Sequence, residues 1–139
     1  MNEPIIIEEL GLIYGRDAIF LDKIEFDETH SVKLIGEFNG SLCENVNNEK
    51  DKYIPYEISF KGILEFKMTE VDFYNDKNYI SSFEKVIDSE RISEFKNLYD
   101  GDIKVKDSHE HFIFHTYDDV IEIIACEFKL TLKTLHNNI

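Results

Sequence analysis

Apolar and polar residues alternate over long stretches of this chain, and a period of two is typical of half-buried β-strands. The first clear case is a hairpin, with strands expected over 17–26 and 31–38 and a polar turn at 27–30. One face of the second strand carries Val32, Leu34, Gly36 and Phe38. We expect this face to point into a core.

The middle of the chain joins a polar segment to a further strand. Asn, Gly and charged residues dominate 39–53, which predicts an exposed loop; at about 15 residues, such a loop is either mobile or functional. Alternation returns over 56–68, so a strand is predicted there. Its shared face would carry Phe60, Gly62, Leu64, Phe66 and Met68. The segment 69–74 is expected to continue this strand after a bulge.

A helical pattern occurs only within 81–98. A spacing of three relates Ile92, Phe95 and Leu98. Ser89 is suited to cap a helix N-terminus, so a short helix is predicted near 89–98. Ser81 and Glu84 form an alternative capping box, which would start the helix earlier. The break in apolar phase after Ile87 instead favours a short strand over 82–87.

The C-terminal third predicts two more strands, 109–117 and 120–132, joined by a tight turn at Asp118 and Asp119. An Asp-Gly turn at 99–102 precedes them. The last strand would present one face made of Val120, Ile124, Cys126, Phe128, Leu130 and Leu132. Its first half is apolar on both faces and its second half is polar on one, which indicates a strand that runs from a covered interior to a solvated edge.

These elements together predict a mainly β fold (a β-rich α+β fold) in a single domain, 1–139. It would be an antiparallel sandwich or a strongly curved sheet with one short helix near 89–98. The chain has 139 residues, of which 42% are hydrophobic, and this is enough for one buried core.

Charge narrows the classes of partner. There are 29 acidic and 15 basic residues, and the formal net charge is −14. Nucleic-acid backbones and anionic membranes are disfavoured, because both require surplus Lys and Arg. A basic protein partner suits this charge, and solubility alone is the competing explanation.

The N-terminus has no basic region or long apolar run, so neither a signal peptide nor a membrane span is expected. Cys43 and Cys126 lie 83 positions apart and are expected to be reduced thiols, with Cys126 packed in the core. These features predict a cytoplasmic protein.

A cluster of histidines is the most distinctive group of chemically active residues. On a strand His109, His111, Ile113, His115 and Tyr117 would share a face. The pair His109 and His111 could reach one metal ion, although the sequence names no third ligand. The favoured interpretation is that these histidines flank a half-exposed strand whose core face carries Phe112 and Phe114. No metal and no cofactor are therefore expected.

Acidic pairs at turns supply candidate contact residues. Asp100, Asp102, Asp118 and Asp119, together with the loop 39–53, are predicted to form the surface that binds a partner, since recognition is concentrated in loops. None of these pairs continues into a calcium-binding loop, and turn formation is a sufficient role for each. No nucleophile elbow or phosphate-binding loop occurs, so an enzyme is not predicted.

Three segments carry a resemblance. They are Phe60-Lys-Gly-Ile-Leu-Glu-Phe-Lys-Met-Thr-Glu-Val-Asp72, Ser81-Ser-Phe-Glu-Lys-Val86 and His111-Phe-Ile-Phe-His-Thr-Tyr-Asp-Asp-Val-Ile-Glu-Ile-Ile-Ala125. They resemble a family of small bacterial proteins from low-GC Gram-positive genomes, some of which are encoded near secreted polymorphic toxins. The resemblance covers about half of the chain and implies a toxin-immunity role, with no catalytic residues to carry over.

Three hypotheses follow from the sequence. The first is an acidic, non-enzymatic binding protein. An immunity protein that neutralises a basic toxin domain would be one example of this class. The second is a metal-dependent small-molecule enzyme or sensor that uses His109 and His111. The third is a homo-oligomeric module in which edge strands pair with each other.

Overall fold

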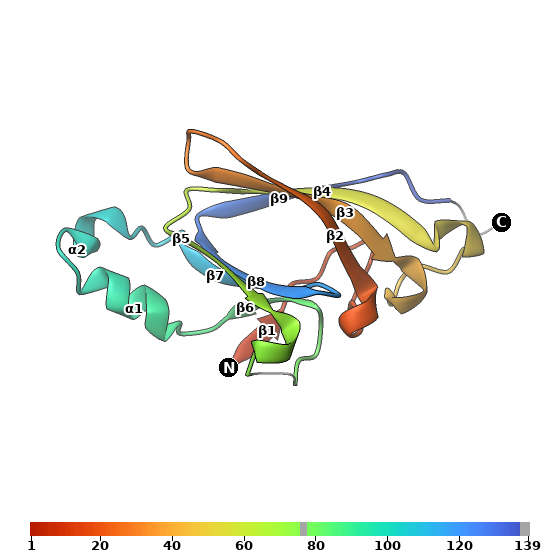
Figure 1. Cartoon of the computed structure of the whole chain (residues 1–139), viewed down its shortest axis with the longest axis horizontal. Coiled ribbons are helices and arrows are strands. Elements are labelled where there is room, and N and C mark those ends of the chain that lie inside the picture. The colour runs from red at the N-terminus through yellow and green to blue at the C-terminus, as the bar shows by residue number, and fades with distance from the viewer. Residues whose placement is uncertain (76–77, 137–139) are drawn as a thin grey trace.

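Two antiparallel β-sheets pack face to face in this computed structural model, which describes residues 1–75 and 78–136 (Figure 1). The chain is mainly β, as the alternation predicted, and the sheets do not close into a barrel. The sandwich form of the prediction is therefore confirmed, with each sheet burying one apolar face against the other.

One sheet has four strands and contains the predicted hairpin. In spatial order its strands are β2 (Ile19–Phe26), β3 (Ser31–Asn39), β4 (Tyr53–Lys61) and β9 (Glu127–Leu132). Val32, Leu34 and Phe38 of β3 are buried, as expected from their shared face. Gly36 is buried on the same face. Glycine is required there because a Cβ would lie 1.9 Å from the carbonyl oxygen of Phe20.

The other sheet has five strands. In spatial order they are β1 (Asn2–Pro4), β6 (Phe83–Val86), β7 (Glu110–His115), β8 (Asp119–Ala125) and β5 (Glu65–Glu70). β6 confirms the short strand predicted over 82–87 and excludes a helix that starts at Ser81. The Glu84 carboxylate instead accepts hydrogen bonds from the N–H groups of Ile80 and Ser81.

The chain passes between the two sheets at two neighbouring places. The N–H of Cys126 donates to the Lys61 carbonyl, and the N–H of Leu64 donates to the Ile124 carbonyl, each over 2.8 Å. Gly62 turns the chain with a φ of 70°, and a Cβ there would lie 2.7 Å from the Cys126 sulfur. Glycine is required because an L side chain would be strained in this conformation and would also collide.

These crossings correct two predicted strands. The segment 56–68 is not one strand, because the turn at Gly62 ends β4 and the chain re-enters the other sheet as β5. The predicted continuation over 69–74 is also absent, since β5 ends at Glu70 and the 3₁₀ turn η4 (Val71–Phe73) follows. The segment 120–132 is likewise divided, at Cys126, into β8 and β9.

The division at Cys126 changes which residues face the core. The core-facing residues of β8 are Ile121, Ile123 and Ala125. Those of β9 are Phe128, Leu130 and Leu132. The single face predicted for the whole segment is therefore wrong, because one residue outside both strands shifts the alternation by one position. The prediction that the first half is buried on both faces is confirmed, since Val120 and Ile124 are buried as well.

Aromatic side chains fill the space between the sheets. The mutually contacting rings are Phe38, Tyr56, Phe60, Phe83, Phe112, Phe114 and Phe128. The buried Tyr56 hydroxyl donates to the Phe20 carbonyl over 2.8 Å, so its polar atom is satisfied within the core.

A helical excursion connects β6 to β7 and projects from one end of the sandwich (Figure 1). It contains α1 (Glu90–Lys96) and the one-turn helix α2 (Gly101–Lys104). Ser89 caps α1 as predicted, since its hydroxyl accepts from the N–H of Ile92. Leu98 lies beyond α1 and is 63% exposed, so the predicted apolar stripe is only partly buried. No helix among the described residues is long and apolar enough to cross a membrane.

The segment 39–53 is not the uniformly exposed loop that was predicted. It contains two 3₁₀ turns, η2 (Gly40–Leu42) and η3 (Glu49–Asp51), and both Cys43 and Asp51 are buried. Side chains of the segment also bind the N-terminal residues. Its amide and carboxylate groups therefore form hydrogen bonds with other parts of the chain, which composition alone did not indicate.

Candidate functional site

His109 lies beside the two crossings between the sheets. Its Nδ1 accepts from the N–H of Lys106 over 2.8 Å, which places the proton of the neutral ring on Nε2. Nε2 lies 3.0 Å from the Gly62 carbonyl oxygen and 3.2 Å from the Cys126 sulfur. His109 therefore links the turn after β4 to the junction of β8 and β9.

Both cysteines are free thiols. Cys43 is buried, and this burial raises the pKa of its thiol to about 12. Cys126 was expected inside an apolar strand, but it is half-buried at the junction between β8 and β9. Cys126 therefore lies where the chain crosses between the sheets and not in the centre of the core.

His111 lies on the outer face of the five-stranded sheet, in a chain of polar contacts. Its Nδ1 is 2.7 Å from the Ser89 hydroxyl, and its Nε2 is 3.2 Å from a carboxylate oxygen of Glu122. The hydrogen bond from His111 holds the pKa of Glu122 below its usual value, although burial acts in the opposite direction. Lys67 pairs with the same carboxylate over 3.5 Å.

This His111 relay has the residue types of a nucleophilic triad, yet its geometry serves another purpose. Ser89 is 6% exposed, and its hydroxyl oxygen already accepts the Ile92 N–H that begins α1. The relay fastens the start of α1 to β7 and β8. A second contact reinforces this attachment, because Arg91 of α1 pairs with Glu65 of β5 over 2.6 Å.

The two histidines considered as metal ligands do not point at a common position. Both ring nitrogens of His109 and of His111 contact protein atoms, and these partners lie in different parts of the fold. Among the described residues, no three His, Cys, Asp or Glu side chains gather where they could hold a metal ion. Phe112 and Phe114 occupy the core side of β7, as expected.

His115 lies at the far end of β7, beneath two tyrosines. It is 4% exposed, and the Tyr79 ring stacks on it with centroids 3.8 Å apart and an interplanar angle of 12°. The Tyr74 ring is 5.7 Å from the His115 ring. These three rings line a cavity of about 190 Å³, which is called the aromatic cavity below.

The acidic residues predicted to bind a partner do not form one surface. Asp100 and Asp102 belong to the helical excursion, before β7 begins. Asp118 and Asp119 lie at the turn where β7 leads into β8. β7 has 6 residues, so its length of roughly 20 Å separates the two pairs.

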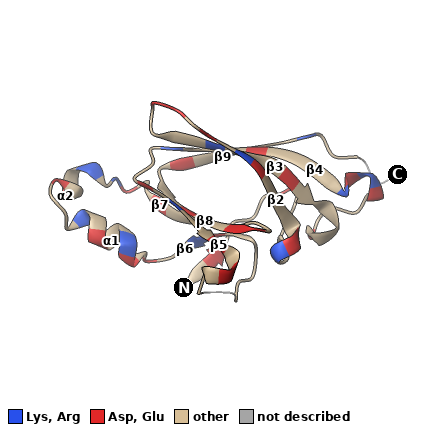
Figure 2. Ribbon diagram, in the orientation of Figure 1, with Lys and Arg blue, Asp and Glu red and all other residues tan. Residues whose placement is uncertain are grey.

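Further carboxylates surround the second pair. Asp119 is the register partner of Glu70, and the N–H of Val71 donates to the Asp118 carbonyl over 2.9 Å. Asp72 follows in η4, and the acidic residues of β5 and β8 are drawn red in Figure 2. Asp17 lies in η1 (Arg16–Ala18) near Tyr79, since burial first, and then the charges of Glu84 and Asp17, raise the pKa of the Tyr79 hydroxyl. We call this group of carboxylates the acidic end; its members are Asp17, Glu70, Asp72, Asp118 and Asp119.

The acidic end has little internal compensation. Arg16 is the cation beside it, and its guanidinium stacks over the Tyr117 ring at 4.8 Å while donating to the Tyr117 carbonyl. Within 1–75 and 78–136, none of the five carboxylates forms an ion pair. Burial, followed by repulsion from Asp118, raises the pKa of Asp119.

The loop 39–53, also predicted as a contact segment, is fastened to the body. Glu44 accepts from the N–H of Leu12 over 3.1 Å, and the Asn45 amide donates to the Glu8 carbonyl over 2.9 Å. The buried Asp51 accepts from both the backbone N–H and the ring of His136. Several of its polar groups are therefore engaged within the chain.

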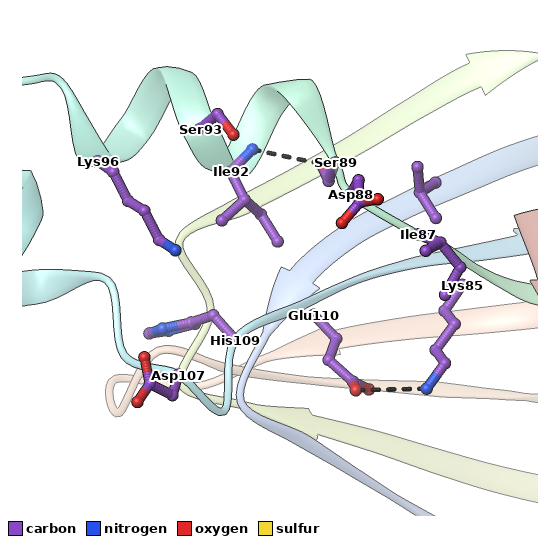
Figure 3. A pocket seen from close by; sticks show the side chains of 11 residues that line it. Lys85, Ile87, Asp88, Ser89, Ile92, Ser93, Lys96, Asp107, His109 and Glu110 are labelled. Carbon is purple, nitrogen blue, oxygen red and sulfur yellow. Dashed lines mark hydrogen bonds and ion pairs between the residues drawn. The ribbon is translucent and has the colours of Figure 1, made fainter. Parts of the chain in front are cut away.

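A second cavity, of about 360 Å³, lies between α1 and the start of β7 (Figure 3). Its lining mixes both signs of charge, with Lys85 and Lys96 near Asp88, Asp107 and Glu110. Lys85 pairs with Glu110 over 3.5 Å. This balance selects no charge class of ligand.

Sequence reasoning missed the aromatic cavity and the His111 relay. The relay joins Ser89, His111 and Glu122, whose pairing depends on strand register. Tyr74 was expected at the end of a strand continued over 69–74, and Tyr79 belonged to no predicted element, so nothing in the sequence indicated that the two rings come together. A useful signal was the shared face of His111 and His115, which the period of two did place correctly.

Comparisons with known proteins add no homologue to this description. No family model, no curated protein and no solved structure matches the chain.

Proposed function

We propose that this protein is a non-enzymatic binding protein that captures a basic protein domain. The observation that carries the proposal is the net charge of −14, together with an acidic end whose carboxylates form no ion pairs among the described residues. Opposite charge accelerates encounter with a basic partner and disfavours acidic ones.

A toxin domain is the proposed partner class. A nuclease toxin is basic because it must hold nucleic acid, so an acidic inhibitor suits it. The expected resemblance to a family of small bacterial proteins, some of which are encoded near polymorphic toxins, supports the same role. The proposed site of action is the cytoplasm, where such an inhibitor would protect the cell that makes it.

The contacts of His109 and His111 disfavour the metal-dependent alternative. It required His109 and His111 to share an ion, and each ring already uses both nitrogens in contacts with the protein.

The test begins with the full-length protein immobilised without an affinity tag and exposed to lysate of its native host at 20 mM and 500 mM NaCl. We expect a basic protein to be retained at low salt and largely released at high salt, because screening weakens long-range attraction. The retained protein is then purified and titrated by calorimetry. We expect 1:1 binding and inhibition of whatever activity that partner has.

A size-matched acidic protein with a similar net charge serves as the control. Retention of the same partner by both proteins would reduce the result to non-specific charge attraction. If no basic partner is retained at 20 mM NaCl, the proposal is wrong. Light scattering on the free protein separates a monomeric binder from an oligomer built on the edge strands β1, β5, β2 and β9.

A further inference from the structure

The aromatic cavity opens next to the acidic end. Asp72 and Thr116 line it together with the three rings, so carboxylate and aromatic groups meet in one space of about 190 Å³. Tyr79 stacks closely on His115, and this contact gives the cavity one ordered wall.

Charge determines which occupant the cavity suits. Among the described residues, the five carboxylates of the acidic end and the guanidinium of Arg16 have formal charges that sum to −4, and Asp72 and Arg16 line the cavity itself. An anion or an acidic side chain would be repelled there. A cation would be attracted by the carboxylates and also by the faces of the tyrosine rings.

The chain itself shows how a guanidinium is accommodated in this region. Arg16 also lines the cavity, and its Nε donates to the Tyr117 carbonyl over 2.7 Å. Its guanidinium lies over the Tyr117 ring at 4.8 Å. A second cation would meet the same combination of aromatic face and oxygen acceptors on the other residues of the cavity.

Repulsion within the acidic end also favours a cation. Asp118 and Asp119 are adjacent, and their proximity is one reason why the pKa of Asp119 is raised. A bound positive charge would relieve this repulsion. The five carboxylates do not converge on a single metal position among the described residues, so an extended organic cation matches their spread better than a metal ion does.

We propose that the aromatic cavity and the acidic end together receive a lysine or arginine side chain of a basic protein partner. This inference rests on the proposed binding function and assigns it to one end of the five-stranded sheet. The other acidic pair, Asp100 and Asp102, lies at the opposite end of β7 and takes no part.

The probe is a tri-arginine peptide, titrated into the ¹⁵N-labelled full-length protein at 20 mM NaCl. We expect saturable shifts of the Thr116 and Asp119 amide resonances, with a Kd on the order of 1 mM, because a few exposed charge contacts give weak binding. A tri-glutamate peptide should produce no saturable shift.

Two charge-matched variants test the location. Asp118→Asn combined with Asp119→Asn should raise the Kd at least fivefold. Asp100→Asn combined with Asp102→Asn removes the same charge from the helical excursion and should change the Kd less than twofold. Equal weakening by both pairs would overturn the proposal, since it would show only a general charge effect.

A third variant tests the cavity separately from its acidic opening. Tyr74→Leu keeps every carboxylate and removes one ring together with the 3.5 Å hydrogen bond from its hydroxyl to Glu122, and we expect at least a threefold increase in Kd. An unchanged Kd would contradict a role for the cavity. Tyr74→Phe is the matched control, because it loses the same hydrogen bond to Glu122 but keeps the ring, and it should retain binding within twofold of the wild type.

The outcome separates this inference from the proposed function. If the peptide does not bind at the acidic end while the protein still captures a basic partner, the cavity assignment is wrong and the binding function stands. If neither the peptide nor a basic protein binds, both proposals are wrong.

Discussion

Single residues attach the helical excursion to the sandwich. His111 reaches Ser89 at the start of α1 and Glu122 in the middle of β8, so one imidazole bridges three elements. The contacts are partly shielded from water, since the His111 and Glu122 side chains are 12% and 19% exposed. A hydrogen bond to a charged group in such a setting stabilises by about 1.5–3 kcal/mol.

Glu122→Gln should lower the free energy of unfolding at pH 7 by about 1–3 kcal/mol, because it removes the charged acceptor of His111. The hydrogen bond from His111 lowers the pKa of Glu122 in the folded state below its ordinary value of 4.5. Its stabilisation is therefore present above pH 4.5 or so and is lost as the pH falls through the folded pKa. Urea unfolding at pH 7 and pH 3 should show a smaller pH-dependent loss in the variant.

Glu127→Gln is the matched control for this measurement. Glu127 is exposed on β9, and its replacement should change stability by less than about 0.5 kcal/mol at either pH. Identical pH profiles for the wild type and Glu122→Gln would show that the relay contributes nothing to acid stability.

At the scale of elements, two crossings decide how the strands are shared between the sheets. β4 and β5 are consecutive in sequence but belong to different sheets, as do β8 and β9. The crossings pack against each other through Gly62 and Cys126, with His109 beside both. The register of both sheets therefore depends on a close contact between two short connections.

Gly62→Ala should destabilise the protein by more than about 2 kcal/mol. The new Cβ would occupy a backbone conformation with φ of 70° and would lie 2.7 Å from the Cys126 sulfur. Gly15→Ala is the comparison, because Gly15 also has a positive φ, of 85°, yet has open space around it. That variant should cost about 1 kcal/mol through backbone strain alone.

A double variant separates collision from strain. Cys126→Ala removes the sulfur, so adding it to Gly62→Ala should recover part of the lost stability in denaturant unfolding. Strictly additive effects of the two substitutions would mean that the crossings are not in contact as described.

At the scale of the whole molecule, the net charge of −14 acts on the folded state itself. Like charges held together in a small volume repel each other, and unfolding relieves that repulsion. The described ion pairs involve mostly exposed side chains, which offset little of it.

Salt should therefore stabilise the protein. Raising NaCl from 20 to 500 mM shortens the screening length from roughly 20 Å to roughly 4 Å. We expect the urea midpoint to rise over this range, and to rise less in the variant that combines Asp118→Asn and Asp119→Asn. A midpoint that falls with salt would indicate that attractive ion pairs dominate the charge interactions of the fold.

The local pattern determined much of this protein. Alternation identified the hairpin of β2 and β3 and the strand β7, because one face of each is apolar and the strand period is two. The break in apolar phase after Ile87 indicated the short strand β6. Ser89 marked the start of α1, since capping depends on residues close in sequence. The net charge of −14, which disfavours nucleic-acid backbones and anionic membranes, was also readable without a structure.

Only the tertiary structure decided where those elements meet. Period two cannot detect one residue such as Cys126 that shifts the alternation, nor a turn such as Gly62 whose neighbours remain apolar. His109 and His111 are two positions apart, yet their rings contact different elements because only His111 lies within β7. Asp118 and Asp119 lie near Glu70 because Asp119 is its register partner in the neighbouring strand. Asp100 and Asp102 lie beyond the other end of β7, because they lie at the start of α2. These outcomes depend on contacts between residues far apart in sequence, which the order of residues does not reveal until the chain has folded.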